Sequence, residues 1–183
     1  MVSYTVPGMK TDDAERVTEL LQDRLNSLND LALTLKHVHW NVVGPNFIAV
    51  HTMLDPQVDA VREMVDDTAE RIATLGGSPV GTPGALVKQR DWDDYSIGRA
   101  DAIAHLGALD VVYAGIIKAH RAAIAETEKL DLVSQDMLIE QAEQLEQFQW
   151  FVRAHLESAD GGLTTGGAST ESAAARRAKK AKQ

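Results

Sequence analysis

The sequence predicts an all-α protein with four long helices, and three observations lead to this fold class. Apolar residues recur at spacings of three and four in four stretches of roughly 25–30 residues, the pattern of one apolar helix face. Leucine, alanine, glutamate and glutamine, which lose little rotamer freedom in a helix, make up much of the chain. Runs of β-branched residues long enough for a strand are scarce. With 183 residues, the chain is long enough for one well-buried domain.

The first helical pattern runs between Asp12 and His39 and follows a short N-terminal arm of residues 1–10. Thr11 or Asp12 is a suitable N-cap, and Gly44-Pro45 is a strong helix terminator. The apolar stripe of this helix comprises Val17, Leu20, Leu21, Leu25, Leu28, Ala32 and Leu35.

A second helix is expected from about Asn46 to about Leu75, where Gly76-Gly77 ends it. Pro56 lies inside this stretch and cannot donate a backbone hydrogen bond. The sequence therefore predicts either a kink at Pro56 or a helix that begins later than Asn46.

Residues 76–95 are rich in glycine and proline, and we expect a long crossover here with a short helix around Trp92. Two further helical patterns follow, from about Ile97 to Thr127 and from about Asp131 to Ser158. A four-helix bundle with one long connection is the ferritin-like variant of this architecture. Residues 11–159 are therefore predicted to form a ferritin-like four-helix bundle, with the short helix lying between helices 2 and 3.

Several classes of protein are excluded or disfavoured by composition. The chain has no cysteine, which excludes disulfides, thiolate metal sites and a thiol nucleophile. Residues 1–10 do not resemble a signal peptide, and there is no run of 18 apolar residues. We therefore expect a cytoplasmic protein with no membrane partner.

The charge is unevenly distributed between the bundle and the C-terminal residues 160–183. The whole chain carries −9, whereas residues 160–183 carry five bases and two acids, which leaves −12 on residues 1–159. The segment is also rich in glycine, serine, threonine and alanine, and this composition predicts a flexible basic tail. An acidic body with a basic tail favours cations for the body and polyanions for the tail.

Five potential metal ligands share one pattern. His39 ends the first helix, while His51 and Asp55 are four residues apart on the second helix, as are Asp66 and Glu70. Residues four apart share a helix face, and the eleven steps from Asp55 to Asp66 turn the helix about 20° past three full turns. Both pairs therefore lie on one stripe. Any one of these residues alone is more typical of a solvated helix surface, but all five in register indicate a site.

One chain cannot bring all five ligands to one ion. His51 and Asp66 are separated by roughly 22 Å along the helix, whereas such ligands bind metals at about 2.0–2.2 Å. Two copies of the helix packed antiparallel about a two-fold axis would bring the His51 end of one to the Asp66 end of the other, forming two equivalent sites. Imidazole and carboxylate ligands suit Fe(II), with Zn(II), Mn(II) and Co(II) as competitors.

The same residues carry a family resemblance. The segment from Lys36 to Asp55 reads K-x-x-H-W-x-x-x-G-x-x-F-x-x-x-H-x-x-x-D, and the segment from Asp66 to Arg71 reads D-x-x-x-E-R. This long pattern resembles the Dps family, mini-ferritins named as DNA-binding proteins from starved cells, and the resemblance extends over residues 10–158.

The resemblance implies roles for several residues. His39 and His51, assisted by Asp55, are similar to the ligands from one subunit, and Asp66 and Glu70 to those from its two-fold mate. Trp40 is similar to a tryptophan beside the family's site, where it intercepts radicals or packs. Asp131, Asp136 and Glu140 resemble the acids of the iron-entry pores, although an acidic first helical turn is an equally good reading.

The family forms hollow dodecamers that oxidise Fe(II), preferably with hydrogen peroxide rather than dioxygen, and store ferric mineral. The resemblance thus implies a ferroxidase that uses iron and no organic cofactor. It assigns no role to four other histidines, which are more typical of structural positions: His37, His105, His120 and His155.

The basic tail suggests binding to double-stranded DNA without sequence preference, and hence a nucleoid-associated protein. Its bases have no interleaved aromatic residues, so they would contact phosphates, and many tails on one shell would act together. A contact between the tail and a neighbouring acidic surface, which would steady the assembly, is the other interpretation. The bases are Arg176, Arg177, Lys179, Lys180 and Lys182.

Two other functions compete with a ferroxidase. One is a structural DNA-compacting protein of the nucleoid with a non-catalytic metal site. The other is a larger di-iron ferritin, which would need a Glu-x-x-His motif within the chain. No such motif occurs in the sequence, so this second alternative is weak.

Overall fold

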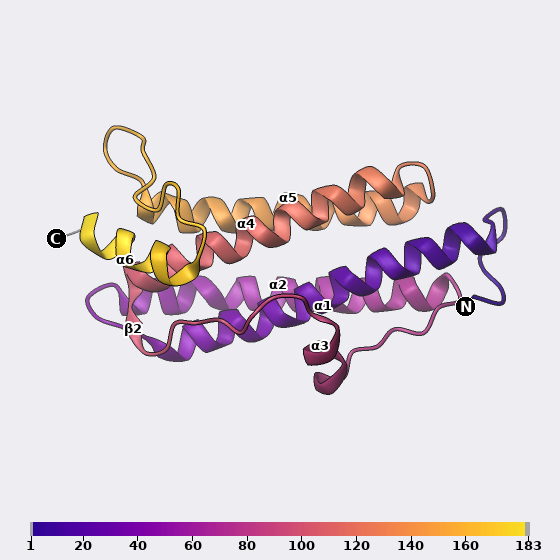
Figure 1. Ribbon diagram of the computed structural model, residues 1–183, viewed down its shortest axis with the longest axis horizontal. Coiled ribbons are helices and arrows are strands. Elements are labelled where there is room, and N and C mark those ends of the chain that lie inside the picture. The colour runs from indigo at the N-terminus through magenta and orange to yellow at the C-terminus, as the bar shows by residue number, and fades with distance from the viewer. Residues whose placement is uncertain (1, 182–183) are drawn as a thin grey trace. The chain divides into compact units, whose positions relative to one another are not determined.

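The computed structural model describes residues 2–181, which contain six helices and two short strands (Figure 1). The four long helices that the sequence predicts are present, and the ferritin-like fold class is confirmed. In chain order the elements are α1 (Thr11–Asn41), β1 (Val42–Val43), α2 (Phe47–Thr74), α3 (Pro83–Gln89), β2 (Ala100–Asp101), α4 (Ala102–Thr127), α5 (Leu132–Leu156) and α6 (Glu171–Ala181).

The chain divides into two compact units, and each long helix contributes residues to both. The first unit comprises residues 1–32, 59–91 and 118–143, and the second comprises residues 33–58, 92–117 and 144–183. The predicted histidine ligands lie in the second unit, whereas Asp66 and Glu70 lie in the first.

The first unit is held by an aliphatic core and by a close approach of the N-terminal arm. Gly76 has φ +86°, and a Cβ built on it would meet the backbone oxygen of Tyr4 at 2.0 Å, so only glycine fits this turn. Each fully buried leucine in the core contributes about 1.5–3 kcal/mol. The core residues are Val2, Ala14, Val17, Leu21, Leu25, Ile72, Leu75, Ala123 and Leu138.

The second unit contains a short parallel strand pair that the sequence did not predict. Val42 pairs with Ala100 and Val43 with Asp101, so the segment after α1 lies beside the segment that precedes α4. Asp101 Oδ1 accepts a hydrogen bond of 3.0 Å from the amide of Ala104 and caps α4. This cap explains why α4 begins at Ala102 rather than near Ile97.

The crossover and α2 also differ in part from expectation. The short helix lies at Pro83–Gln89, so its predicted position around Trp92 is wrong. Proline suits the first position of a helix because its missing N–H would have no partner there. Helix α2 runs without a break from Phe47 to Thr74 with Pro56 inside it, so a later start is also wrong.

Residues Glu171–Ala181 form α6 where the sequence predicted a flexible tail. Ala174, Ala175 and Ala178 are buried, and the carbonyl of Ala174 and the methyl of Ala178 lie against Gly107 of α4. A glycine on one helix and alanines on the other permit close approach of the two backbones. The periodicity of these small residues was hidden by the glycine-rich and basic composition around them.

Helix α4 is long and apolar enough to cross a membrane by length and composition, although the sequence contains no run of 18 apolar residues. In its most apolar stretch, 56% is buried within the chain. A helix that is apolar on most sides is either a core helix or a membrane span, and burial of this extent is typical of a core helix.

Candidate metal centre

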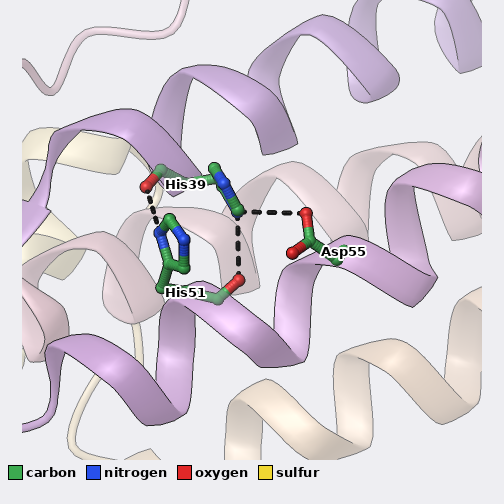
Figure 2. A group of neighbouring side chains, drawn as sticks. All are labelled: His39, His51 and Asp55. Carbon is green, nitrogen blue, oxygen red and sulfur yellow. Dashed lines mark hydrogen bonds and ion pairs between the residues drawn. The ribbon is translucent and has the colours of Figure 1, made fainter.

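His39, His51 and Asp55 come together at the turn between α1 and α2. His39 stands two residues before the end of α1, and the other two lie one turn apart near the start of α2. Gly44, with φ +95°, forms the turn, and its carbonyl accepts a hydrogen bond from the amide of Phe47. One ligand atom from each of the three side chains lies within 4.8 Å of the others (Figure 2).

The two imidazoles hold each other in a defined orientation. The Nδ1 atom of His39 lies 3.0 Å from the His51 carbonyl oxygen, and the Nδ1 atom of His51 lies 2.9 Å from the His39 carbonyl oxygen (Figure 2). A carbonyl can only accept, so each Nδ1 carries the proton and each Nε2 keeps its lone pair. Their rings stack with centroids 3.6 Å apart. Both Nε2 atoms are therefore the ones suited to bind a metal.

Asp55 supplies the negative charge of the cluster. Its Oδ1 lies 3.1 Å from Lys36 Nζ and 3.2 Å from His39 Nδ1. The hydrogen bond from Lys36, together with the positive charge of its ammonium group, holds the pKa of Asp55 below its usual value. Asp55 is therefore ionised at neutral pH and has the charge that a cation site requires.

Asp66 and Glu70 lie further along α2, outside this cluster. Both side chains are exposed on their own chain. Among residues 2–181, the only group of three or more such ligands within reach of one ion is His39, His51 and Asp55. The assignment of Asp66 and Glu70 to a partner subunit's site stays a prediction.

Two neighbours of the cluster add to the set of predicted residues, and a third, Trp40, was among those predicted. Trp40 is 71% exposed, and Lys36 Nζ lies 6.0 Å from its ring centroid. Phe47 packs on the ring of His51, with centroids 4.9 Å apart. Lys36 and Phe47 had no assigned role. Lys36 is three residues from His39 and Phe47 is four residues from His51, so each shares a helix face with that histidine.

The three predicted pore acids have different surroundings. The Oδ2 atom of Asp131 accepts a hydrogen bond of 2.6 Å from Arg71 and one of 3.1 Å from the amide of Ser134, so this carboxylate caps α5 and pairs with α2. Asp136 and Glu140 are exposed and one turn apart on α5. A pore lining remains a prediction, and only the latter two carboxylates face solvent.

The predicted DNA-binding bases fall on two kinds of position in α6. Lys179 forms an ion pair of 2.8 Å with Asp101, and Arg177 donates a hydrogen bond to the Gly166 carbonyl. Arg176 and Lys180 are exposed and make no ion pair with any other residue in the range 2–181. Lys182 lies outside the described residues.

Comparison with known proteins decides the family. The ferritin-like domain model matches residues 18–161. The DNA protection during starvation protein of Mycolicibacterium smegmatis is 61% identical over 180 residues, which cover 98% of each chain. The chain belongs to the Dps family of ferritin-like proteins.

Solved Dps structures match this fold closely. The structure of Mycobacterium smegmatis Dps has a TM-score of 0.91 at 62% identity and covers 93% of this chain and 97% of its own. DpsA14 from Streptomyces coelicolor has a TM-score of 0.89 at 67% identity and covers 90% of this chain and 98% of its own. The family resemblance read from the sequence is thereby confirmed.

Proposed function

We propose that this Dps protein is a ferroxidase and iron store that oxidises Fe(II), preferably with hydrogen peroxide. Its sites would be shared across a two-fold subunit interface of a dodecameric shell, in which Fe(III) is mineralised. The observation that carries the proposal is the cluster of His39, His51 and Asp55, whose ligand atoms lie within 4.8 Å of one another. Neutral imidazole and carboxylate are suitable ligands for Fe(II).

The chain's own residues prepare this site for its substrate. The reciprocal hydrogen bonds hold both Nε2 lone pairs free, and Asp55 is ionised at neutral pH. Asp66 and Glu70 of the partner subunit would complete the ligand set. Two Fe(II) ions, each giving one electron to peroxide, yield two Fe(III) ions and two hydroxides, and no hydroxyl radical is released. This chemistry would protect DNA in the cytoplasm.

DNA binding is the second part of the proposal. Arg176 and Lys180 on α6 are exposed and suited to phosphate contacts without sequence preference. Such contacts, repeated over twelve subunits, would be weak singly and strong together. The protein would then act at the nucleoid. A structural DNA-compacting protein with a non-catalytic metal site is the alternative function.

Stopped-flow oxidation of Fe(II) by peroxide tests the site. We expect the double variant His51→Ala, Asp66→Ala to lose the fast phase, because it removes one ligand from each half of the site. The matched control is the double variant His155→Ala, Asp67→Ala, which alters an exposed histidine and the exposed aspartate that follows Asp66 in the sequence. An unchanged fast phase in the first variant would contradict the ferroxidase assignment and favour the alternative.

Subunit mixing tests whether the site is shared. His51→Ala chains and Asp66→Ala chains are unfolded, mixed in equal amounts and reassembled. In a two-fold dimer of one chain of each kind, one of the two sites has all of its ligands, so random pairing restores about a quarter of the sites. A site contained in one chain would show no recovery on mixing.

A further inference from the structure

Tyr95, which is partly buried, and His105, which is fully buried, form a hydrogen-bonded pair that the ferroxidase site does not use. Tyr95 lies between α3 and β2, and His105 lies in the first turn of α4. The phenol oxygen is 3.1 Å from His105 Nδ1, and the two rings are nearly parallel, 13° apart. The His105 side chain is fully buried. This geometry lets the phenol donate its hydrogen bond to an unprotonated ring nitrogen.

The Tyr95 phenol and the His105 imidazole are both neutral in the resting protein. Burial, with a smaller contribution from the charge of Glu171, raises the pKa of Tyr95 above its usual value, so the phenol keeps its proton. Burial lowers the pKa of His105, and the backbone of Asn41 acts in the opposite direction. Asp101 also favours the charged form, whereas His37 disfavours it. The protonated phenol can therefore donate a proton, and the neutral imidazole beside it can accept that proton.

The other tyrosines lack such a partner. Tyr113 is fully buried, but its hydroxyl donates to the amide oxygen of Gln57 at 2.7 Å, and an amide is not a base at neutral pH. Tyr4 is 69% exposed and lies in the first unit. Of the three tyrosines in the chain, Tyr95 alone combines partial burial with a hydrogen bond to a basic nitrogen.

His37 contacts this pair from α1, the helix that also carries His39. Its ring packs edge-on against Tyr95, with centroids 5.8 Å apart, and its Nε2 is fixed 2.9 Å from the Ile97 carbonyl. His37 precedes His39 by two residues on α1, a rise of about 3 Å along the axis. Tyr95 and His105 belong to the same compact unit as His39, His51 and Asp55.

We propose that Tyr95 is a redox-active residue that gives one electron to oxidants formed at the iron site, while His105 accepts its proton. The proposal rests on the ferroxidase function proposed above. Its oxidant is a hydroxyl radical, formed when a single Fe(II) reduces peroxide. The radical takes one electron from Tyr95 and becomes hydroxide.

The accompanying proton transfer makes the step reversible. When Tyr95 loses an electron, its O–H bond breaks and an N–H bond forms at Nδ1 of His105, which leaves a neutral phenoxyl radical beside an imidazolium. A further Fe(II) ion returns the electron, and the proton returns from His105 to the phenol oxygen. The net change is one Fe(II) oxidised and one hydroxyl radical converted to hydroxide, with the protein unaltered.

Freeze-quench electron paramagnetic resonance tests the proposal on the assembled protein in a Tyr4→Phe background. Fe(II)-loaded protein is mixed with peroxide, and ring-deuterated tyrosine identifies a tyrosyl signal. We expect this signal to fall to background in Tyr95→Phe and to persist in Tyr113→Phe, which removes the fully buried phenol. An unchanged signal in Tyr95→Phe, or no tyrosyl signal in the parent during rapid iron oxidation, would overturn the proposal.

A second measurement separates this proposal from the ferroxidase function. In iron-free protein, a photogenerated ruthenium tris-bipyridine oxidant replaces the iron chemistry, and the same tyrosyl radical is expected. Its formation should slow in D₂O and be lost in His105→Asn, which removes the base. A Tyr95 radical that forms with ruthenium but not with iron and peroxide would refute the link to the iron site. If rapid iron oxidation is absent, the ferroxidase function fails, while the ruthenium measurement still decides whether Tyr95 and His105 react as a pair.

Discussion

Lys36 Nζ lies 3.1 Å from Oδ1 of Asp55, so a lysine holds the carboxylate that is predicted to bind iron. The two residues come from α1 and α2, and Lys36 precedes His39 by one helical turn. A divalent cation that binds Asp55 must therefore compete with an ammonium group already beside it. The ion pair between Lys36 and Asp55 therefore opposes metal binding at Asp55.

Removal of the Lys36 charge should tighten metal binding. In Lys36→Met the aliphatic stem is retained, and Asp55 remains ionised at pH 7 even if its pKa returns to the ordinary value near 3.9. We expect affinity for Co(II), measured by calorimetry on the assembled protein, to rise about two- to fivefold, the order of effect of an exposed ion pair. Lys88→Met, at an exposed position on α3, is the control. Weaker binding in Lys36→Met would show that the ammonium positions Asp55 rather than competing for it.

Asp131 should contribute to stability in a pH-dependent way. Burial alone would raise its pKa, but the Ser134 hydroxyl and the Arg71 guanidinium together hold the pKa below the usual value. Asp131→Asn keeps a good N-cap and removes the charge, and we expect a loss of about 2–3 kcal/mol, because Arg71 retains some exposure.

The sign of the pH effect follows from the lowered pKa. The stabilisation by Asp131 is present above the unfolded-state pKa of about 3.9 and is lost as pH falls through the lower folded-state pKa. The deficit of Asp131→Asn in denaturant unfolding should thus be constant near neutrality and shrink below about pH 4. Asp136→Asn, at an exposed position on the same helix, should show little deficit. A deficit independent of pH would contradict the role of the charge.

Gly107 should control the attachment of α6. A Cβ at this position would lie 2.8 Å from the Ala174 carbonyl oxygen and 3.0 Å from the Ala178 methyl, so Gly107→Val should displace α6. We expect faster tryptic cleavage at Arg176 and Arg177 in this variant. Gly115→Ala on the same helix meets nothing within 4 Å and should instead stabilise α4 by about 1 kcal/mol. Equal cleavage rates in the parent and Gly107→Val would show that α6 is not held at this contact.

The exposed bases of α6 should contribute more to DNA binding than the paired one. Each phosphate contact removed should reduce the slope of log affinity against log salt by about 0.9. We expect a clear reduction of this slope in the single variants Arg176→Gln and Lys180→Gln. The reduction should be smaller in Lys179→Gln, because Lys179 is paired with Asp101. Fluorescence anisotropy at several salt concentrations measures the slopes, with Lys88→Gln as control. These substitutions are sharper than deletion of residues 160–183, which would also uncover Gly107. Equal slopes in all three α6 variants and the parent would exclude DNA contacts by these bases.

Much of the fold could be read from the sequence because helical periodicity is a local property. The stripe from Val17 to Leu35 predicts α1, and Gly76-Gly77 correctly predicts the end of α2. The short helix was misplaced because Trp92 is a conspicuous residue, whereas Pro83 after Thr82 is the actual start signal. Helix α6 was missed because alanines that pack on a glycine have no distinctive hydropathy.

The sequence by itself determined the fold class, the family and the candidate ligands His39, His51, Asp55, Asp66 and Glu70, since these depend on residue type and on spacing along a helix. Only the tertiary structure decided which partner each polar group takes. Lys36 pairs with Asp55, Asp131 pairs with Arg71 sixty residues away, and the Tyr95 hydroxyl is hydrogen-bonded to His105. A hydrogen bond needs two atoms within about 3 Å, and segments distant in sequence meet at that precision only after their apolar faces have packed.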